Sequence, residues 1–260
     1  MKKKTRIIAI IQARMGSSRL PGKVLMPICD QPMIAWVIKR ASRSRLLDEI
    51  IVATTTDKSD DDLVKYCEEN GTVTFRGSPQ DVLDRYYKAA LSSSANIIVR
   101  LTADCPLLDG ALIDAVIQPV LAGQVDFCAN RLPPPFKRTY PIGLDVEVVT
   151  FPALEKTWSE AAQPYEREHV LPYIYTHPEL FRIKVLDHDN DLGNQRWTVD
   201  TPKDLEFVKA VLKELGCRDD FHWQDIERVL TEKPELKSLN VNVAHKTYLD
   251  VDERATRKNT

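Results

Sequence analysis

The sequence predicts an α/β fold, in which a Rossmann-like, mostly parallel sheet is flanked by helices. Apolar runs of strand length alternate with amphipathic runs of helical length through the first half of the chain. Polar residues gather where these strands end, which is where open parallel sheets bind their ligands. At 260 residues, the chain is long enough for one sizeable core. We therefore expect a single domain over residues 1–250 and a disordered tail at 251–260.

The expected elements of the first half alternate in type. Short runs rich in Ile, Val and Thr predict strands, and apolar residues at helical spacing predict helices. In chain order we expect a strand at 5–13, a helix at 32–41, a strand at 49–55, a helix at 59–70 capped by Ser59 or Asp60, a strand at 73–76, a helix at 78–94, a strand at 96–104, a helix at 107–123 and a strand at 125–130. This order favours parallel strands with helices on both faces.

The second half begins with a break in this pattern. Three consecutive prolines within 131–141 predict a loop, because proline interrupts both helices and sheets. After it we expect a strand at 143–151, a short helical stretch at 164–178, a strand, turn and helix across 196–216, and an amphipathic helix at 221–232.

Charge and hydropathy exclude two classes of partner. The formal net charge is −2, which gives no broad basic field, so we expect no nucleic acid partner. No apolar stretch approaches the length of a membrane span, so we expect no membrane association. The basic start and the run at 7–11 resemble a signal peptide, but the run is too short and Gln12 and Arg14 follow it.

The cysteines indicate the cellular compartment. There are five, an odd number, widely spaced and without a CxxC motif. This pattern argues against a disulfide framework or a zinc site and favours a reducing cytoplasm.

The segment QARMGSSRLPGK, residues 12–23, is the strongest functional signal. Its loop follows a buried strand, so backbone N–H groups and the positive charges of Arg14, Arg19 and Lys23 can meet a triphosphate. The spacing of its glycines matches neither a Walker A loop nor GxGxxG. The alternative is a solvated basic turn, but the density of Arg, Gly, Ser and Lys favours phosphate binding.

Two aspartates form a second candidate site, for a metal ion. Asp104 ends VRLTAD and Asp200 lies in WTVDTPKD, and each follows an expected strand. Magnesium prefers carboxylate and phosphate oxygens, so the pair suits a metal bound to a triphosphate. For Asp200 the sequence leaves a second interpretation equally open, namely a cap of the helix that follows.

These motifs resemble the CMP-sugar synthetases, the cytidylyltransferases that act on 3-deoxy-manno-octulosonate and on sialic acids. The resemblance is greatest to the branch of spore coat polysaccharide biosynthesis protein F. Besides residues 12–23, the resemblance rests on FRGSPQDVLDRYYKAA, VRLTADCPLLD, YPIGLDVEVV, EREHVLPYIY and WTVDTPKDLEFV, which together span about residues 5–215. It implies a Rossmann-like domain with a small lobe, at about 131–180, for acceptor binding and dimerisation.

The resemblance also implies a set of site residues. The catalytic residues would be Arg14, Lys23, Asp104 and Asp200, and the two aspartates would hold Mg²⁺ as the cofactor. The nucleotide would be bound by Gln12, Ala13, Gly16, Arg19, Lys23, Thr54, Asp81, Arg85 and Thr102. The acceptor would be bound by Asp145, Glu147, Arg167, Glu168 and His169.

Some of these residues have ordinary structural interpretations. Asp81 and Arg85 share a helix face and would form a surface ion pair. The polar run 166–169 would be a charged helix surface, and a single histidine such as His169 is more often structural than a general base. Cys105 is more often a packing residue than a nucleophile.

We therefore expect a cytoplasmic, homodimeric cytidylyltransferase. An acceptor oxygen would attack the α-phosphorus of CTP, and pyrophosphate would leave. The acceptor would be an acidic 2-keto-3-deoxy sugar, with a phosphonate or other small anion as the alternative. Two other classes remain open: a glycosyltransferase, for which Asp145 to Glu147 is the only near match to a DxD motif, and a non-catalytic nucleotide-binding subunit.

Overall fold

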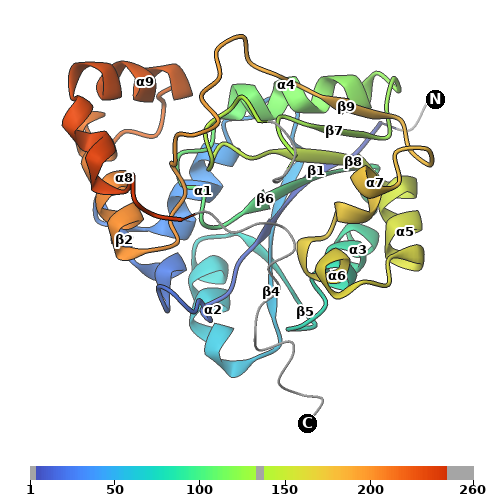
Figure 1. The fold of residues 1–260 in the computed structure, drawn as a ribbon. Coiled ribbons are helices and arrows are strands. Elements are labelled where there is room, and N and C mark those ends of the chain that lie inside the picture. The colour runs from blue at the N-terminus through green and yellow to red at the C-terminus, as the bar shows by residue number, and fades with distance from the viewer. Residues whose placement is uncertain (1–3, 133–137, 245–260) are drawn as a thin grey trace.

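A seven-stranded sheet with helices on both faces forms the centre of the computed structural model, which describes residues 4–132 and 138–244 (Figure 1). The strand order is β5-β4-β1-β6-β8-β7-β9, and only β8 runs antiparallel to the others. The predicted fold class is thereby confirmed. The predicted tail at 251–260 and the three consecutive prolines lie outside the described residues.

The strands of the sheet are short. They are β1 (Ile7–Gln12), β4 (Glu49–Thr55), β5 (Val73–Gly77), β6 (Ile97–Thr102), β7 (Phe127–Ala129), β8 (Glu147–Thr150) and β9 (Ile183–Val185). A separate hairpin consists of β2 (Pro27–Ile28) and β3 (Gln31–Pro32). Because β5, β4, β1 and β6 are parallel neighbours, their carboxyl ends share one edge of the sheet.

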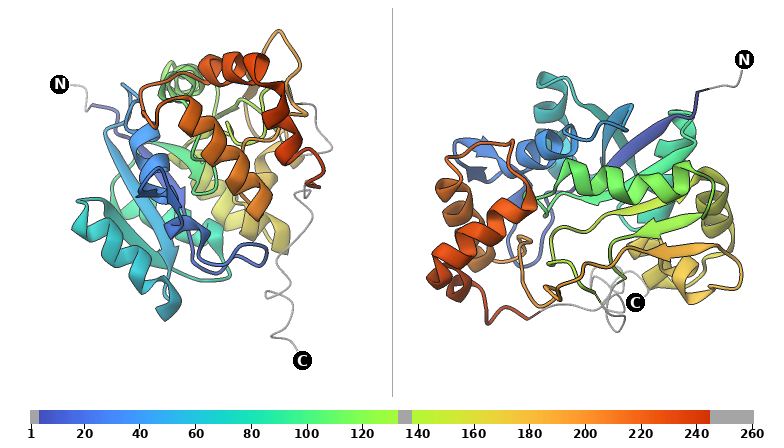
Figure 2. Two further views of the ribbon diagram at one scale, coloured as in Figure 1. Left: turned by 90° about the vertical axis from the view of Figure 1, so that its left-hand side faces the viewer. Right: turned by 90° about the horizontal axis from the view of Figure 1, so that it is seen from above.

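The helices form two layers (Figures 1 and 2). One layer contains α1 (Met33–Ala41), α2 (Asp61–Glu69), α4 (Gly110–Leu121), α8 (Pro202–Glu214) and α9 (Trp223–Glu232). The other contains α3 (Val82–Ser92), α5 (Phe151–Glu160), α6 (Pro164–His169) and α7 (Pro172–Thr176). Three short 3₁₀ helices complete the described elements: η1 (Lys23–Leu25), η2 (Lys58–Asp60) and η3 (Pro234–Leu239).

The first strand explains why the chain forms two cores. Side chains of successive strand residues point to opposite faces, so Ile7 and Ile11 pack against one helix layer and Ile8 and Ile10 against the other. A strand buried on both faces reads as a continuous apolar run, which is why IIAII needs no alternation.

The structure departs from the predicted elements in three places. The strand predicted within 196–216 does not form: Arg196 makes a single bridge with Ile142, and the Val199 N–H donates to the Asp104 carbonyl at 2.8 Å. The hairpin β2–β3 and strand β9 were not predicted. Strand β8 begins only at Glu147, so the preceding Asp145 lies outside it. Strand β9 and the bridge of Arg196 pair with segments far away in the sequence, which local patterns do not reveal, whereas β2 and β3 are two-residue strands too short to give a pattern.

Residues 138–180 are part of the main body. Strand β8 lies between β6 and β7 in the central sheet. Leu154 of α5 and Ile174 of α7 are fully buried in the same core as Ile10 of β1. The dimerisation role of this region stays a prediction, but β8 has both edges occupied and offers no free edge to a second copy.

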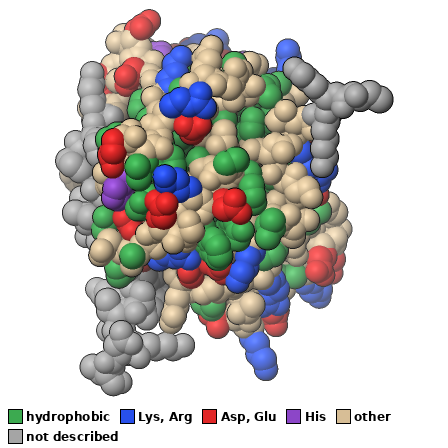
Figure 3. Space-filling view, turned by 90° about the vertical axis from the view of Figure 1, so that its right-hand side faces the viewer, with side chains coloured by type: hydrophobic (Ala, Val, Ile, Leu, Met, Phe, Trp, Pro, Cys, Tyr) green, Lys and Arg blue, Asp and Glu red, His purple; other side chains and the backbone are tan. Residues whose placement is uncertain are grey.

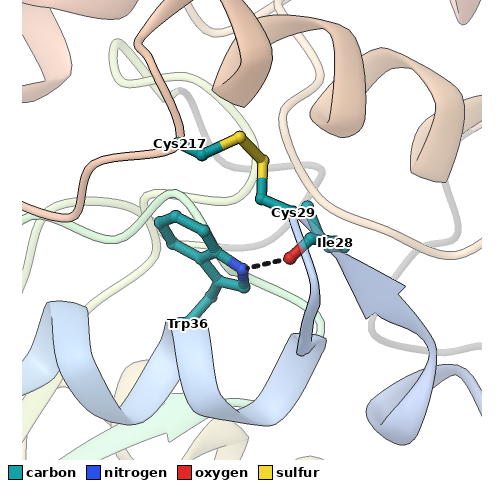
Figure 4. The surroundings of a disulfide bond; sticks show 4 residues. All are labelled: Ile28, Cys29, Trp36 and Cys217. Atoms are coloured by element: carbon teal, nitrogen blue, oxygen red, sulfur yellow. Dashed lines mark hydrogen bonds between the residues drawn. A yellow bond between two sulfur atoms is a disulfide. The ribbon is translucent and has the colours of Figure 1, made fainter.

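A disulfide joins Cys29 to Cys217, contrary to the expectation from cysteine spacing (Figure 4). The two Cα atoms are 5.8 Å apart although 188 positions separate them in sequence. Cys29 lies at the turn of the β2–β3 hairpin, next to Ile28, whose carbonyl accepts a hydrogen bond of 2.8 Å from the Trp36 indole. The bond fastens the hairpin to the segment after α8; Cys67, Cys105 and Cys128 are free and buried.

Candidate active site

The signature loop leaves the sheet at the end of β1. Its backbone is folded on itself, since the N–H groups of Ser17 and Gly22 both donate to the Met15 carbonyl at 2.9 Å. Gly22 has a φ of 71°, a conformation that side chains other than glycine adopt at a cost. The turn at Gly22 leads directly into η1 and so directs Lys23 inward, where only 9% of the residue is exposed.

Asp60 holds this loop in place, a role that the sequence did not reveal. Its buried carboxylate accepts hydrogen bonds from the Met15 N–H at 2.7 Å and from the Thr54 hydroxyl at 3.0 Å, and it also bonds Thr55. We had expected Asp60 to cap the helix at 59–70, but its side chain makes no cap hydrogen bond. Asp60 instead joins the signature loop to the end of β4, where the Thr54 hydroxyl donates to its carboxylate.

Lys23 is the centre of the charged site. Its ammonium group lies 2.9 Å from the Asp200 carboxylate and 3.5 Å from that of Asp104, and it donates to the Val199 carbonyl at 2.6 Å. Burial lowers the pKa of Lys23, but the two carboxylates outweigh it and raise the pKa above its ordinary value. The two aspartates predicted to hold a metal therefore converge on one positive charge.

Asp200 is surrounded by cations. Arg19 lies 3.1 Å and Arg196 2.8 Å from its carboxylate, in addition to Lys23. Burial raises the pKa of Asp200, but these cations outweigh it and hold the pKa well below its usual range. Asp200 is therefore a carboxylate at neutral pH.

The structure decides between the two interpretations of the Asp200 side chain. The cap of α8 is Thr201, whose hydroxyl accepts from the Asp204 N–H, while the Asp204 carboxylate accepts from the Thr201 N–H. The capping interpretation of Asp200 is therefore wrong. Arg196 and the fully buried Asp204 form an ion pair at 2.9 Å behind it. Neither was expected, because both face inward only once α8 is placed.

Two of the predicted nucleotide-binding residues, Asp81 and Arg85, lie at the start of α3 and do not form the ion pair that their spacing predicts. Asp81 caps α3 by accepting from the Asp84 N–H at 2.8 Å and pairs with Arg167 at 2.6 Å, so the expected ion pair with Arg85 is wrong. Arg85 is 2% exposed, and its Nε has no hydrogen-bond partner among the described residues. Burial, with the nearby charge of Arg14 adding to it, lowers the pKa of Arg85.

The remaining nucleotide candidates lie at the same sheet edge. Gln12 pairs in register with Ala53 and with Thr102 of the neighbouring strands. Ala13 continues this contact, its N–H donating to the Ala53 carbonyl at 3.1 Å. Arg14 and Gly16 follow within the signature loop. The structure thus brings the predicted residues of β1, β4 and β6 to one edge of the sheet.

The acceptor candidates are divided between two places. Glu147 is 3% exposed and forms a buried ion pair with Arg100, and Asp145 pairs with Arg138 and Arg131. Arg167 is instead engaged by Asp81. Glu168 and His169 are half-buried at the end of α6. Arg100, Arg131 and Arg138 were missed because arginines in strands and loops give no motif by themselves.

A sequence model of the cytidylyltransferase family matches residues 8–241. The chain belongs to this family. A cytidylyltransferase of Leptospira borgpetersenii has a similar structure, with a TM-score of 0.86 and 34% identity over 93% of this chain and all of that one. The spore coat polysaccharide biosynthesis protein SpsF of Bacillus subtilis is 33% identical, over 88% of this chain and 95% of that protein.

A third relative is named for its acceptor. The 3-deoxy-manno-octulosonate cytidylyltransferase of Anaeromyxobacter dehalogenans is 30% identical, over 79% of this chain and 97% of that protein. The predicted family and enzyme class are confirmed: this cytidylyltransferase is a nucleotidyltransferase. The glycosyltransferase and non-catalytic alternatives fall away with that result.

The described part of this cytidylyltransferase contains no cluster of three or more His, Cys, Asp or Glu side chains arranged for a metal ion. An ion held by Asp104 and Asp200 would therefore take its other ligands from phosphate and water, as magnesium does in many nucleotide sites. Among the described helices, none is long and apolar enough to cross a membrane.

Proposed function

We propose that this cytidylyltransferase transfers CMP from CTP to an acidic sugar, with release of pyrophosphate, in the synthesis of a surface polysaccharide or glycoconjugate. One observation carries the proposal: Lys23, at the end of the signature loop, joins Asp104 and Asp200 at the carboxyl edge of the parallel strands. This arrangement puts phosphate-binding cations and two carboxylates in one place. The names of the two curated relatives support the choice of acceptor and pathway.

The cations have distinct tasks in this mechanism. Arg14, Arg19 and Lys23 bind the β- and γ-phosphates and stabilise the charge that develops on pyrophosphate. Arg196 and Asp204 fix the position of Asp200. Asp60 keeps the loop in its bent form, so that little rearrangement is needed when CTP binds.

Magnesium fits the carboxylates of Asp104 and Asp200. Both are partly exposed, at 29% and 20% of the side chain, and both face the crevice at Lys23, although Asp200 is also paired with Arg19 and Arg196. When bound, magnesium supplies charge neutralisation at the α-phosphate and lowers the pKa of a bound hydroxyl. The neighbouring Lys23 would then be shared between the carboxylates and the phosphates.

The reaction itself needs little covalent help from the protein. A hydroxyl oxygen of the acceptor gives its proton to solvent and attacks the α-phosphorus, the bond from that phosphorus to the oxygen that bridges it to the β-phosphate breaks, and pyrophosphate leaves with that oxygen. The side chains position the two reactants and balance charge, which accounts for most of the rate gain in phosphoryl transfer.

The nucleoside is bound beside the triphosphate. Arg85 supports this assignment, because a guanidinium with an unpartnered buried Nε is costly unless a ligand or neighbour compensates it. Gln12 and Thr102 lie at the same strand ends. Thr54 contributes through Asp60 and keeps the loop in place.

Pyrophosphate release tests the proposed function. The enzyme is incubated with Mg²⁺, each of CTP, UTP, ATP and GTP, and acceptors that include 3-deoxy-manno-octulosonate, N-acetylneuraminate and a simple phosphonate. We expect release with CTP and a sugar acid. Equal release with UTP, or release with the phosphonate alone, would contradict the proposed donor or acceptor.

Assembly and location stay predictions. Side chains of α3, of α5 and of the segment after α7 are available to a second copy: Tyr87 of α3 stacks on Trp158 of α5 at 4.1 Å, and Leu180 is 41% exposed. Figure 3 looks onto this side of the molecule, where hydrophobic side chains lie among charged ones. A two-fold dimer in the cytoplasm is the arrangement we propose, and light scattering at micromolar concentration tests the dimer.

A further inference from the structure

The disulfide between Cys29 and Cys217 joins the two parts of the chain that carry opposite charges of the candidate active site. Cys29 belongs to the hairpin that follows η1, and η1 begins at Lys23. Cys217 follows α8, and Asp200 lies just before that helix. The bond is therefore a second link between two segments whose charges already meet, since the Lys23 ammonium group lies 2.9 Å from the Asp200 carboxylate.

The backbone between Lys23 and Cys29 is short and held by hydrogen bonds. The Met26 N–H donates to the Lys23 carbonyl at 3.0 Å, and the Met26 carbonyl accepts from the Met33 N–H at 2.9 Å. The Trp36 indole donates to the carbonyl of the residue before Cys29 at 2.8 Å. A change in the position of the hairpin therefore reaches η1, and with it Lys23, through few bonds.

Both cysteines have backbone conformations that other residues adopt more easily. Their φ angles are 46° at Cys29 and 53° at Cys217, in the left-handed region. Cys29 and Asp30, with a φ of 62°, form the two-residue turn of the hairpin, where Asn and Gly are typical. Cys217 follows the end of α8, where Gly is the usual left-handed residue. Cysteine at both places has a conformational cost, which the bond between the two side chains offsets.

The two sulfur atoms differ in access. Cys217 is exposed, whereas Cys29 is half-buried and packs against the core (Figure 4). A cavity of about 240 Å³ is lined in part by Cys217, Trp36 and Arg43, and Cys29 does not line it. Thiol–disulfide exchange requires free approach to one of the two sulfur atoms. The Sγ of Cys217 is therefore the atom that a small thiol reaches first.

The other three cysteines of the chain are protected from this reaction. Cys67, Cys105 and Cys128 are free and buried. Burial raises the pKa of Cys67 and of Cys128 to about 11, and it raises the pKa of Cys105 as well. The reactive form of cysteine is the thiolate, so these three groups are inert thiols at neutral pH. Exchange is thus confined to the disulfide.

An accessible disulfide has a particular meaning in the cytoplasm, the location proposed above. Structural disulfides are rare there, and those that form are usually transient and respond to the redox state of the cell. Exposed disulfides are also the ones most easily reduced. The exposure of Cys217 therefore favours a bond that opens and closes over one that is permanent.

We propose that the Cys29–Cys217 disulfide is a modification site for small thiols, attacked at Cys217, and that its opening weakens the binding of CTP. A thiolate attacks the Sγ of Cys217, the S–S bond breaks, and Cys29 leaves with the electron pair and takes a proton from solvent. When the reagent is a dithiol, its second thiolate displaces the Cys217 sulfur, which also takes a proton. The reagent is oxidised to a disulfide and the protein is reduced to two thiols.

The effect on CTP follows from the position of the bond. Val208, Val211 and Leu212 keep α8 in the core, so the hairpin is the part that gains freedom when the bond opens. Lys23 is then positioned less firmly for the phosphates, and binding has to restore that order. We expect reduction to weaken CTP binding about five- to tenfold, and CTP must favour the disulfide over the two thiols by the same factor.

The site of attack is tested with one variant for each sulfur. Cys29→Ser leaves Cys217 as a free thiol, and Cys217→Ser leaves Cys29. Both are reacted with oxidised glutathione, and the mixed disulfide is quantified by mass spectrometry, with the three buried cysteines as internal controls. We expect Cys217 to react about tenfold faster than Cys29, because access controls the rate. Equal rates, or faster reaction at Cys29, would overturn the assignment of Cys217.

The effect on the active site is tested by calorimetry with CTP and Mg²⁺, on the wild type before and after reduction with dithiothreitol. Cys29→Ser is the matched control, because it cannot form the bond: it should bind CTP like the reduced wild type, with or without dithiothreitol. At a fixed dithiothreitol concentration, CTP should raise the ratio of disulfide to dithiol wild type about five- to tenfold. Equal CTP affinity of the two redox forms, or an equal effect of dithiothreitol on Cys29→Ser, would overturn the link to CTP.

The link to CTP rests on the proposed function, whereas the modification site does not. If the wild type binds CTP but transfers CMP to no sugar acid, the proposed acceptor is wrong and the comparison of the two redox forms still decides the link. If the oxidised wild type binds no CTP, the proposed donor and the link are both wrong. In that case the reaction of Cys217 with oxidised glutathione decides the modification site.

Discussion

The predicted nucleotide side and the predicted acceptor side of this site are both rich in charge, but they differ in exposure. On the nucleotide side, Arg19, Asp104 and Asp200 keep 20% to 32% of their side chains exposed around Lys23, which keeps 11%. On the acceptor side, Arg100 and Glu147 keep less than 10%. Exposed pairs can exchange partners at small cost, whereas buried pairs must keep theirs. The first region is suited to binding phosphate and metal, and the second to providing a fixed frame.

The largest effect on stability should come from breaking the buried ion pair between Arg100 and Glu147. Glu147→Gln leaves the Arg100 charge without its carboxylate, and breaking a buried pair costs about 3–5 kcal/mol of stability. Denaturant unfolding measures the loss. Glu69→Gln is the control, because its pair with Lys65 is exposed and should contribute less than about 1 kcal/mol. Similar losses in the two variants would remove the distinction between the regions.

The disulfide gives a second test, because it fastens the hairpin that follows η1 to the segment that follows α8. Cys29→Ser should lower the free energy of unfolding by about 2–4 kcal/mol, since the loop that the bond closes is long. A reductant should lower the melting temperature of the wild type and leave that of the variant unchanged. If reductant affects both equally, the bond does not stabilise the protein.

The carboxylates at Lys23 should matter for turnover more than for folding. Asp104→Asn removes a charge but no volume, and we expect kcat to fall about a hundredfold or more because several kcal/mol of metal-dependent stabilisation is lost. The melting temperature should change little. Asp61→Asn, which alters an exposed pair with Arg76, is the control. Near wild-type turnover at saturating Mg²⁺ would exclude Asp104 as a ligand.

The smallest effect should come from a single phosphate contact in the signature loop. Arg14→Ala should weaken CTP binding about ten- to hundredfold, the value of one charge-assisted hydrogen bond, without a change in acceptor preference. Calorimetry with CTP measures the loss of affinity, and Lys88→Ala, on the exposed side of α3, is the control.

Lys23→Ala should weaken CTP binding as well. It should also destabilise the fold, because the partly buried carboxylates of Asp104 and Asp200 lose the ammonium group that they share.

The fold class could be predicted from the sequence, and so could the placement of the nucleotide-binding candidates at one edge of the sheet. Apolar runs reveal strands because burial on both faces leaves no polar positions, as in β1. The ends of parallel strands are local in sequence, so Gln12 to Lys23 and Asp104 could be assigned to one edge without knowing the packing. Burial of Lys23 between Asp104 and Asp200 could not be foreseen, since it joins residues 177 positions apart.

How the charges pair became visible only in the folded chain. Asp200 and Asp204 are both carboxylates near the start of α8, and only packing shows that Asp204 completes the capping box with Thr201 while Asp200 faces Lys23. Arg100 and Glu147 face each other because β6 and β8 are antiparallel neighbours, a pairing that no local pattern contains. A charged residue in a sequence carries no record of its partner, because the pairing energy depends on burial and distance that exist only after the chain has folded.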